Sequence, residues 1–163
     1  GTEPMETPER RARITADIVA RTGVDEPTIE TLVRSFYARV MQDPLLAPVF
    51  DAHITDWEPH LERMSAFWSS VALLTGRYSG QPMAKHQPLP VDAAHFDRWL
   101  ALFERTARET CTPAGADHVV ERARMIAQSL EMGIAGHHGV LLMKGERYRL
   151  PTGDGGGGAE AAA

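Results

Sequence analysis

The sequence predicts an all-α fold. Apolar side chains recur at steps of three and four residues along most of the 163-residue chain, which is the spacing of one buried helix face. Proline and aspartate stand where these apolar runs begin, and glycine stands where several of them end. No segment shows the alternation of a strand bounded by hairpin turns. We therefore expect five helices.

Composition narrows the classes of protein and of partner. The chain is long enough for one domain with a real core. Seventeen basic against 22 acidic side chains give a net charge of −5, which argues against nucleic-acid binding. A single cysteine excludes an intrachain disulfide and a cysteine-rich metal site. The sequence lacks a signal-peptide run and the roughly 20 apolar residues of a membrane span, so we expect a cytoplasmic protein without a membrane partner.

The first predicted helix runs from about Pro8 to Gly23. It carries Ile14, Ile18 and Val19 as one apolar stripe, which indicates packing on the outside of a domain.

The second predicted helix begins at Asp25-Glu26-Pro27, an acidic start with proline in the first turn, and ends before Asp43-Pro44. Tyr37 lies in the middle of its apolar face. A buried phenol must find a hydrogen-bond partner or cost about 1–3 kcal/mol. Tyr37 is therefore either a satisfied core tyrosine or a donor that faces a ligand. The whole face consists of Ile29, Leu32, Val33, Phe36, Tyr37, Val40 and Met41.

Residues 45–50 form an apolar corner that is too short and too rich in proline for a regular element. The third helix starts after Asp56 as N-cap and fades by Gly76. His60 is the anomaly on its apolar face, because it is the one polar ring there. A histidine at such a position is more often a satisfied core residue than a functional one. The face comprises Trp57, His60, Leu61, Met64, Phe67, Trp68, Val71 and Leu74.

The fourth and fifth helices complete the domain. The fourth is capped by Asp92, and the fifth follows a break at Thr112-Pro113-Ala114-Gly115 and stops at Gly136. Trp99 adds a polar N–H to the face of the fourth helix, which is made of Phe96, Trp99, Leu100, Phe103, Ala107 and Thr110. We divide the chain into a helical N-terminal extension (1–26), the domain (27–136) and a flexible Gly/Ala-rich tail (137–163).

His86 lies in a short segment between prolines. Pro82 suits a first helical position, and Pro88 and Pro90 forbid a helix beyond His86, so about one helical turn is expected. Such a turn holds an imidazole in one orientation, as a metal ligand requires. The alternative is a surface histidine on a loop.

Three predicted apolar faces each carry one polar aromatic side chain, namely Tyr37, His60 and Trp99. A porphyrin suits this pattern, since it needs apolar walls, an axial nitrogen ligand such as His86, and donors on the opposite face. A non-haem iron or zinc site would need inward carboxylates, which are missing from these faces. The alternative is a helical interaction module without a cofactor, in which the three side chains are ordinary core residues.

The segment from about Thr28 to Gly136 resembles the truncated haemoglobins, most closely their third group. Five pieces carry the resemblance in the right order: Ser35-Phe36-Tyr37, Asp43-Pro44-Leu45-Leu46-Ala47-Pro48-Val49-Phe50, Trp57-Glu58-Pro59-His60 with Phe67-Trp68, Gly80-Gln81-Pro82-Met83-Ala84-Lys85-His86 and His95-Phe96-Asp97-Arg98-Trp99-Leu100.

The resemblance implies a shortened globin, a two-on-two helical sandwich around haem b, with His86 as the proximal iron ligand. Tyr37, His60 and Trp99 would line the distal side, where the family binds O₂, CO and NO. An enzyme for NO dioxygenation, nitrite reduction or peroxide chemistry is the alternative on the same scaffold, and turnover would require an unidentified reductase. The wall of the haem pocket would comprise Phe50, Met64, Phe67 and Phe96.

Overall fold

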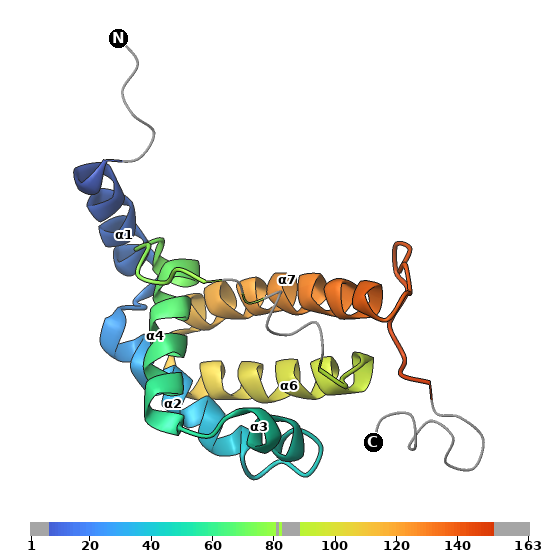
Figure 1. Ribbon diagram of the computed structural model, residues 1–163. Coiled ribbons are helices and arrows are strands. Elements are labelled where there is room, and N and C mark those ends of the chain that lie inside the picture. Colours follow the sequence, from blue (N-terminus) through green and yellow to red (C-terminus); the bar gives the residue numbers. More distant parts are fainter. Residues whose placement is uncertain (1–6, 81, 83–88, 152–163) are drawn as a thin grey trace.

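The computed structural model describes residues 7–80, 82 and 89–151. Within these ranges it contains helices and no strand, which confirms the all-α prediction. The predicted turn around His86 lies outside the described residues, as does the Gly-rich end of the chain. The helices within these ranges are α1 (Pro8–Thr22), α2 (Glu26–Val40), α3 (Ala47–His53), α4 (Trp57–Leu73), α6 (Ala93–Thr110) and α7 (Pro113–His137) (Figure 1).

Local capping explains where the helices begin. The side chain of Asp25 accepts a hydrogen bond from the N–H of Thr28 (3.0 Å), and that of Asp92 accepts one from Ala94 (3.0 Å). Asp56 is the N-cap of α4 through its extended backbone, without a side-chain hydrogen bond. The three starts predicted from aspartate are confirmed.

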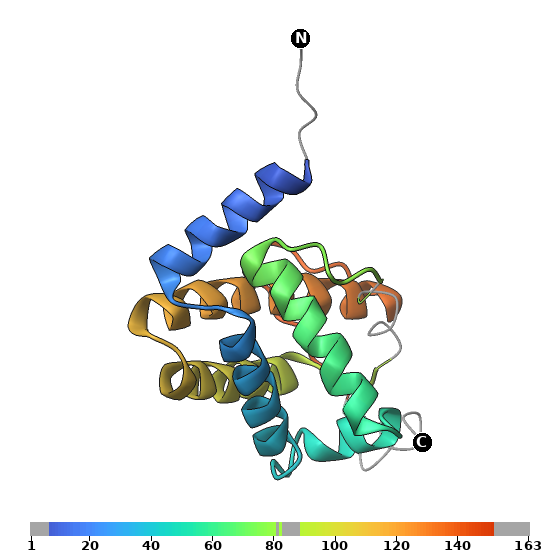
Figure 2. The ribbon, with the colours of Figure 1, turned by 90° about the vertical axis from the view of Figure 1, so that its left-hand side faces the viewer.

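The helices form two crossing layers. The pair α6 and α7 lie side by side, and α2 and α4 run across them (Figures 1 and 2). Phe36 of α2 and Phe103 of α6 meet at the crossing, with 5.4 Å between ring centroids. The core around them is fully buried and includes Ile29, Leu32, Val33, Val40, Leu73, Ala107, Val119 and Ala123.

Helix α1 projects beyond the two layers (Figure 2). Its apolar stripe faces the domain as predicted. Ile18 is buried, and the partly buried side chains of Ile14 and Val19 pack against the core. The Thr15 hydroxyl donates to the carbonyl of Leu73 (2.7 Å), which fastens α1 to the end of α4. None of the described helices combines the length and apolar character that a membrane span requires.

The corner predicted for residues 45–50 is wrong in part, because α3 forms there. The carboxylate of Asp43 accepts hydrogen bonds from the N–H groups of Leu45 (3.2 Å) and Leu46 (3.0 Å), so the chain turns immediately before Ala47. Pro48 then falls in the first helical turn, where proline is tolerated. Pro48 is therefore compatible with this helix and does not prevent it.

The buried face of α4 also ends one residue earlier than predicted. Leu73 is buried, whereas Leu74 adopts a left-handed conformation (φ 58°) as C-cap and is 46% exposed.

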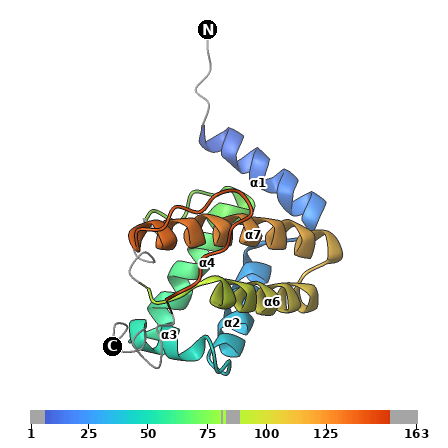
Figure 3. The same cartoon turned by 90° about the vertical axis from the view of Figure 1, so that its right-hand side faces the viewer.

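The chain beyond α7 differs from the flexible tail expected after His137. Residues 138–150 turn back and pack against the ends of α6 and α7, and Tyr148 is only 2% exposed (Figure 3). Arg147 pairs with Glu131 and Asp97, a long-range arrangement that a compositional argument misses.

Candidate functional site

Tyr37 is the buried polar group at the centre of the candidate site. It projects from α2 and is 7% exposed. Burial raises the pKa of its hydroxyl above the ordinary value of 10.0, so the group stays protonated and can donate a hydrogen bond. Within the described part of the chain this hydroxyl makes no hydrogen bond. A desolvated donor in this state suits a polar ligand that binds beside it.

Aromatic rings from two other helices, α3 and α4, surround Tyr37. The ring-centroid distances from Tyr37 are 5.1 Å to His60, 5.8 Å to Trp57 and 5.7 Å to Phe50. Trp57 and His60 belong to the first turn of α4, whereas Phe50 comes from α3. The short helix that the sequence does not predict therefore supplies one side of the site.

His60 meets both neighbouring rings edge to face. The planes of His60 and Tyr37 are inclined by 83°, and the planes of His60 and Trp57 by 87°. The Nε2 atom of His60 is shielded from solvent, although the residue as a whole is half-buried. The anomalous histidine of the sequence thus lies beside the anomalous tyrosine.

Trp99 reaches the same region through Phe36. It stacks on Phe103 (5.4 Å, 15°) and meets Phe36 edge to face (5.5 Å, 86°), while Phe36 contacts Tyr37 (5.1 Å). The indole N–H of Trp99 has no hydrogen-bond partner among the described residues. Like the Tyr37 hydroxyl, it is a donor that the described residues leave unused.

The predicted wall residues lie at different distances from the Tyr37 cluster. Phe50 touches Tyr37, and Met64 is half-buried on α4 and packs against the core. Phe67 packs on Tyr78 (5.2 Å) near the far end of α4. Phe96 is buried in a second apolar cluster between α6 and α7. Trp57 also belongs to the candidate site, because its ring lies against Tyr37. The sequence indicates only that Trp57 lies on the apolar face of α4.

His86 lies outside the described residues, but the chain on either side of its segment is held. The N–H of Tyr78 donates to the Ser70 hydroxyl (2.7 Å) before it, and Val91 is buried after it.

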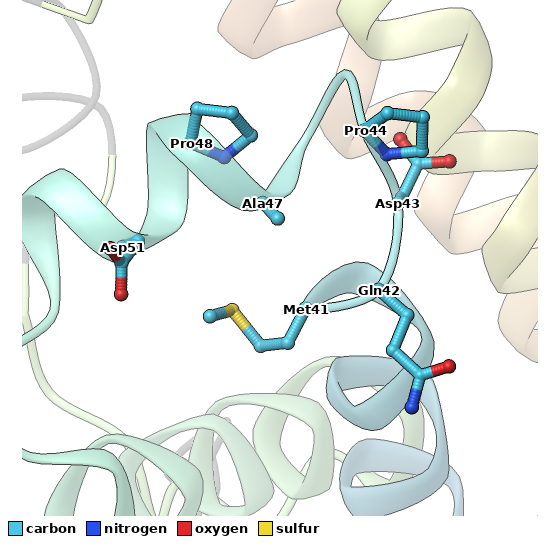
Figure 4. A pocket seen from close by; sticks show the side chains of 7 residues that line it. All are labelled: Met41, Gln42, Asp43, Pro44, Ala47, Pro48 and Asp51. Carbon is cyan, nitrogen blue, oxygen red and sulfur yellow. The ribbon is translucent and has the colours of Figure 1, made fainter.

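A separate hollow lies at the surface between the end of α2 and α3 (Figure 4). It has a volume of about 550 Å³, and Met41 points across it from α2. It is open to solvent and contains none of the predicted site residues. Its lining residues are Met41, Gln42, Asp43, Pro44, Ala47, Pro48 and Asp51.

Comparison with known proteins identifies the family. The family model of the bacterial-like globins matches residues 21–131. A group 3 truncated haemoglobin from Campylobacter jejuni is 31% identical over 113 residues, which are 66% of this chain and 89% of that protein. The chain belongs to the bacterial-like globins. The resemblance of this globin to the truncated haemoglobins is confirmed, and family membership implies haem-based ligand binding.

Solved structures agree with this assignment. The crystal structure of the group III truncated haemoglobin from Campylobacter jejuni has a TM-score of 0.62 and 32% identity to this globin, and the match covers 66% of this chain and 88% of that one. A group II truncated haemoglobin from Bacillus anthracis shares the fold, with a TM-score of 0.56 at 24% identity over 90% of this chain and 99% of the other.

The residues present fit a haem. The cluster around Tyr37 offers large aromatic surfaces for a flat apolar macrocycle, and two donors without a described partner for a ligand on its iron. Among the described residues, no group of three or more His, Cys, Asp and Glu side chains is placed to hold a metal ion directly.

Proposed function

We propose that this globin holds haem b through His86 and binds diatomic ligands, O₂, CO and NO, on the face lined by Tyr37, His60 and Trp99. The observation that carries the proposal is the desolvated hydroxyl of Tyr37 beside the ring of His60, with 5.1 Å between centroids. An interaction module without a cofactor would leave that hydroxyl without a hydrogen-bond partner among the described residues.

The haem iron supplies the position at which a diatomic ligand binds. Around it, the chain's own side chains select and retain the ligand. The Tyr37 hydroxyl donates a hydrogen bond to the bound ligand. A donor that is already desolvated loses little water when this bond forms. The rings of Phe50 and Trp57 close the Tyr37 side of the site against bulk water.

Trp99 acts as a second donor of fixed orientation. Its stack on Phe103 and its edge contact with Phe36 restrict rotation of the indole, so that its N–H is presented in one direction. Met64, Phe67 and Phe96 would form the apolar wall around the macrocycle. His60 contributes an imidazole close to Tyr37, which can donate to the ligand or restrict its passage.

The same donors favour a second function, an enzyme for NO dioxygenation, nitrite reduction or peroxide chemistry. Hydrogen bonds that hold a polar diatomic ligand also stabilise charge that develops when an O–O or N–O bond breaks. Such turnover would need a separate reductase. Consumption of NO by the oxygenated protein, measured with a reductase supplied, separates the two: stoichiometric loss indicates a binding protein and sustained loss indicates an enzyme.

Titration of the haem-free protein with haemin tests the proposal. The wild-type protein should bind one equivalent with a strong Soret band. His86→Ala should weaken binding and change the band, whereas His137→Ala, at an exposed histidine on the end of α7, should leave both unchanged. Equal spectra for the wild type and His86→Ala would remove His86 from the iron.

A further inference from the structure

Glu131 is a buried carboxylate on α7 that the globin site does not use. It is 5% exposed, which is unusual for an acidic side chain unless it is paired. Its oxygens accept hydrogen bonds from Arg147 Nε (3.1 and 3.0 Å), from Arg147 Nη2 (2.9 Å) and from the backbone N–H of Tyr148 (2.8 Å). These partners all belong to residues 138–150, which we call the strap.

The strap also binds the beginning of α6. Arg147 Nη2 donates to Asp97 (2.8 Å), and the N–H of Ala93 donates to the carbonyl of Tyr148 (2.9 Å). The N–H of Leu150 donates to the carboxylate of Asp92, the N-cap of α6 (3.0 Å). Figure 3 shows the strap, coloured orange to red, leaving α7 and descending to the start of α6. One short segment thus joins the two helices.

Tyr148 brings an apolar contact to the same place. Its ring is 2% exposed and stacks on His138 (5.6 Å, 26°), and its hydroxyl pairs with His138 Nδ1 (2.7 Å). It belongs to one buried cluster with Val91 and Phe96, against which Leu89 and Leu150 also pack. The strap therefore covers the chain between Pro90 and the first turn of α6.

This position matters because of what precedes it in the sequence. Leu89 and Val91 follow His86 closely, so the strap holds the downstream end of the segment that carries the histidine. The strap lies beyond residues 21–131, the part of the chain that the globin family model matches.

We propose that Glu131 and Arg147 are positioning residues for the proximal side of the haem: they hold the strap on Leu89 to Ala93, and the strap fixes the orientation in which His86 is presented to the iron. This inference rests on the proposed function. Glu131 and Arg147 contact the strap and α6, so their effect passes through Tyr148 and the chain after His86.

Arg147→Ala is the direct test. The substitution leaves Glu131 buried without its guanidinium, which releases the strap. We expect the strap to exchange its amide hydrogens faster in the haem-free protein, and the loaded protein to lose haem to an acceptor globin at least about tenfold faster. The iron–imidazole stretching band of the ferrous protein should shift, because the imidazole is oriented differently.

Arg108→Ala is the matched control. Arg108 also joins α6 to α7, through Asp117 (2.7 Å), but at the opposite end of the pair and at the surface. Haem loss should change by less than about twofold and the iron–imidazole band should stay in place, since exposed ion pairs contribute little.

A double variant separates release of the strap from the effect of a buried unpaired charge. In Glu131→Gln with Arg147→Ala the buried charge is absent, and the amide can still accept from Tyr148. Haem loss that remains at least several-fold faster, with the band still shifted, supports positioning by the strap. A return of both to wild-type values would overturn it and assign the effect of Arg147→Ala to the charge alone.

Two failures are distinguishable. The proposed function fails if the wild-type protein has no iron–imidazole band, or if His86→Gly keeps the band. If the band is present and both it and the haem-loss rate are unchanged in Arg147→Ala, only the inference about the strap is wrong.

Discussion

The ring of Tyr37 meets the ring of His60 edge to face, with 5.1 Å between centroids and 83° between planes. The two side chains come from α2 and α4, the helices that cross the α6–α7 pair (Figure 1). A desolvated phenol and an imidazole that are distant in sequence thus occupy one aromatic cluster, which is the basis of the proposed distal site.

Tyr37→Phe should raise the dissociation rate of O₂. The variant keeps the ring contacts with His60 and Phe50 and removes only the donor. A hydrogen bond to a charged acceptor contributes about 1.5–3 kcal/mol, so dissociation should be about ten to a hundred times faster in stopped-flow measurements.

Tyr78→Phe is the control for that variant, because it also removes one phenol and keeps a ring contact, here with Phe67 (5.2 Å). Its off-rate should equal that of the wild type. An unchanged off-rate in Tyr37→Phe would exclude Tyr37 from the distal site.

The contribution of Tyr37 should not depend on pH between 6 and 10. Burial raises the pKa of its hydroxyl above the ordinary 10.0, so the group remains a protonated donor across this range. The ratio of the off-rates of Tyr37→Phe and wild type, measured at several pH values, should stay constant. A decline of this ratio with a midpoint below pH 10 would contradict the desolvated environment described for Tyr37.

Trp99→Phe should speed O₂ dissociation about tenfold, because it removes the indole donor and retains a ring to stack on Phe103. If Tyr37 and Trp99 bond the same ligand, the double variant should show less than the sum of the two free-energy changes. Strict additivity in the off-rates would indicate that the two donors act on different ligand atoms or states.

The sequence predicts well what is decided within a few residues. Asp25 and Asp92 begin helices because their side chains cap nearby N–H groups, and Tyr37 and His60 are recognisable because a polar ring interrupts a regular apolar face. Their proximity follows from the resemblance to a known family rather than from spacing. His86 is outside the described residues, so its role remains a prediction.

Features that depend on distant partners were not predictable. Residues 138–150 read as a loose tail by composition, yet they are held by Glu131 and by the backbone of Ala93. Trp57 reads as an ordinary core residue until the fold brings Tyr37 against it. Helix α3 was missed for a local reason, because its start depends on an Asp43 turn and not on a regular N-cap.

Asp43→Asn should destabilise the protein at neutral pH. The carboxylate is buried and accepts hydrogen bonds from Arg98 (2.5 Å) and from the N–H groups that begin α3. The loss should be about 1–3 kcal/mol in urea unfolding at pH 7, because hydrogen bonds to a charged group are weakened. Asp51→Asn, an exposed carboxylate on α3, is the control and should change stability little.

The same variant gives a pH dependence. Burial alone would raise the pKa of Asp43, but the hydrogen bonds from Arg98, Leu46 and Leu45 outweigh it, and the pKa lies below the ordinary 3.8. The stabilisation is therefore complete above pH 3.8 and is lost as the pH falls through the lower value of the folded state. The stability gap between wild type and Asp43→Asn should shrink below that pH. A gap that grows on acidification would contradict the sign of the shift.

The absorption spectrum of the ferrous protein, with and without CO, tests the central claim most directly. We predict a strong Soret band that shifts on addition of CO in the wild type, and His86→Gly should lose this behaviour until free imidazole is added. A protein that takes up no haemin, or a CO shift that is the same in His86→Gly without imidazole, would contradict a haem held through His86.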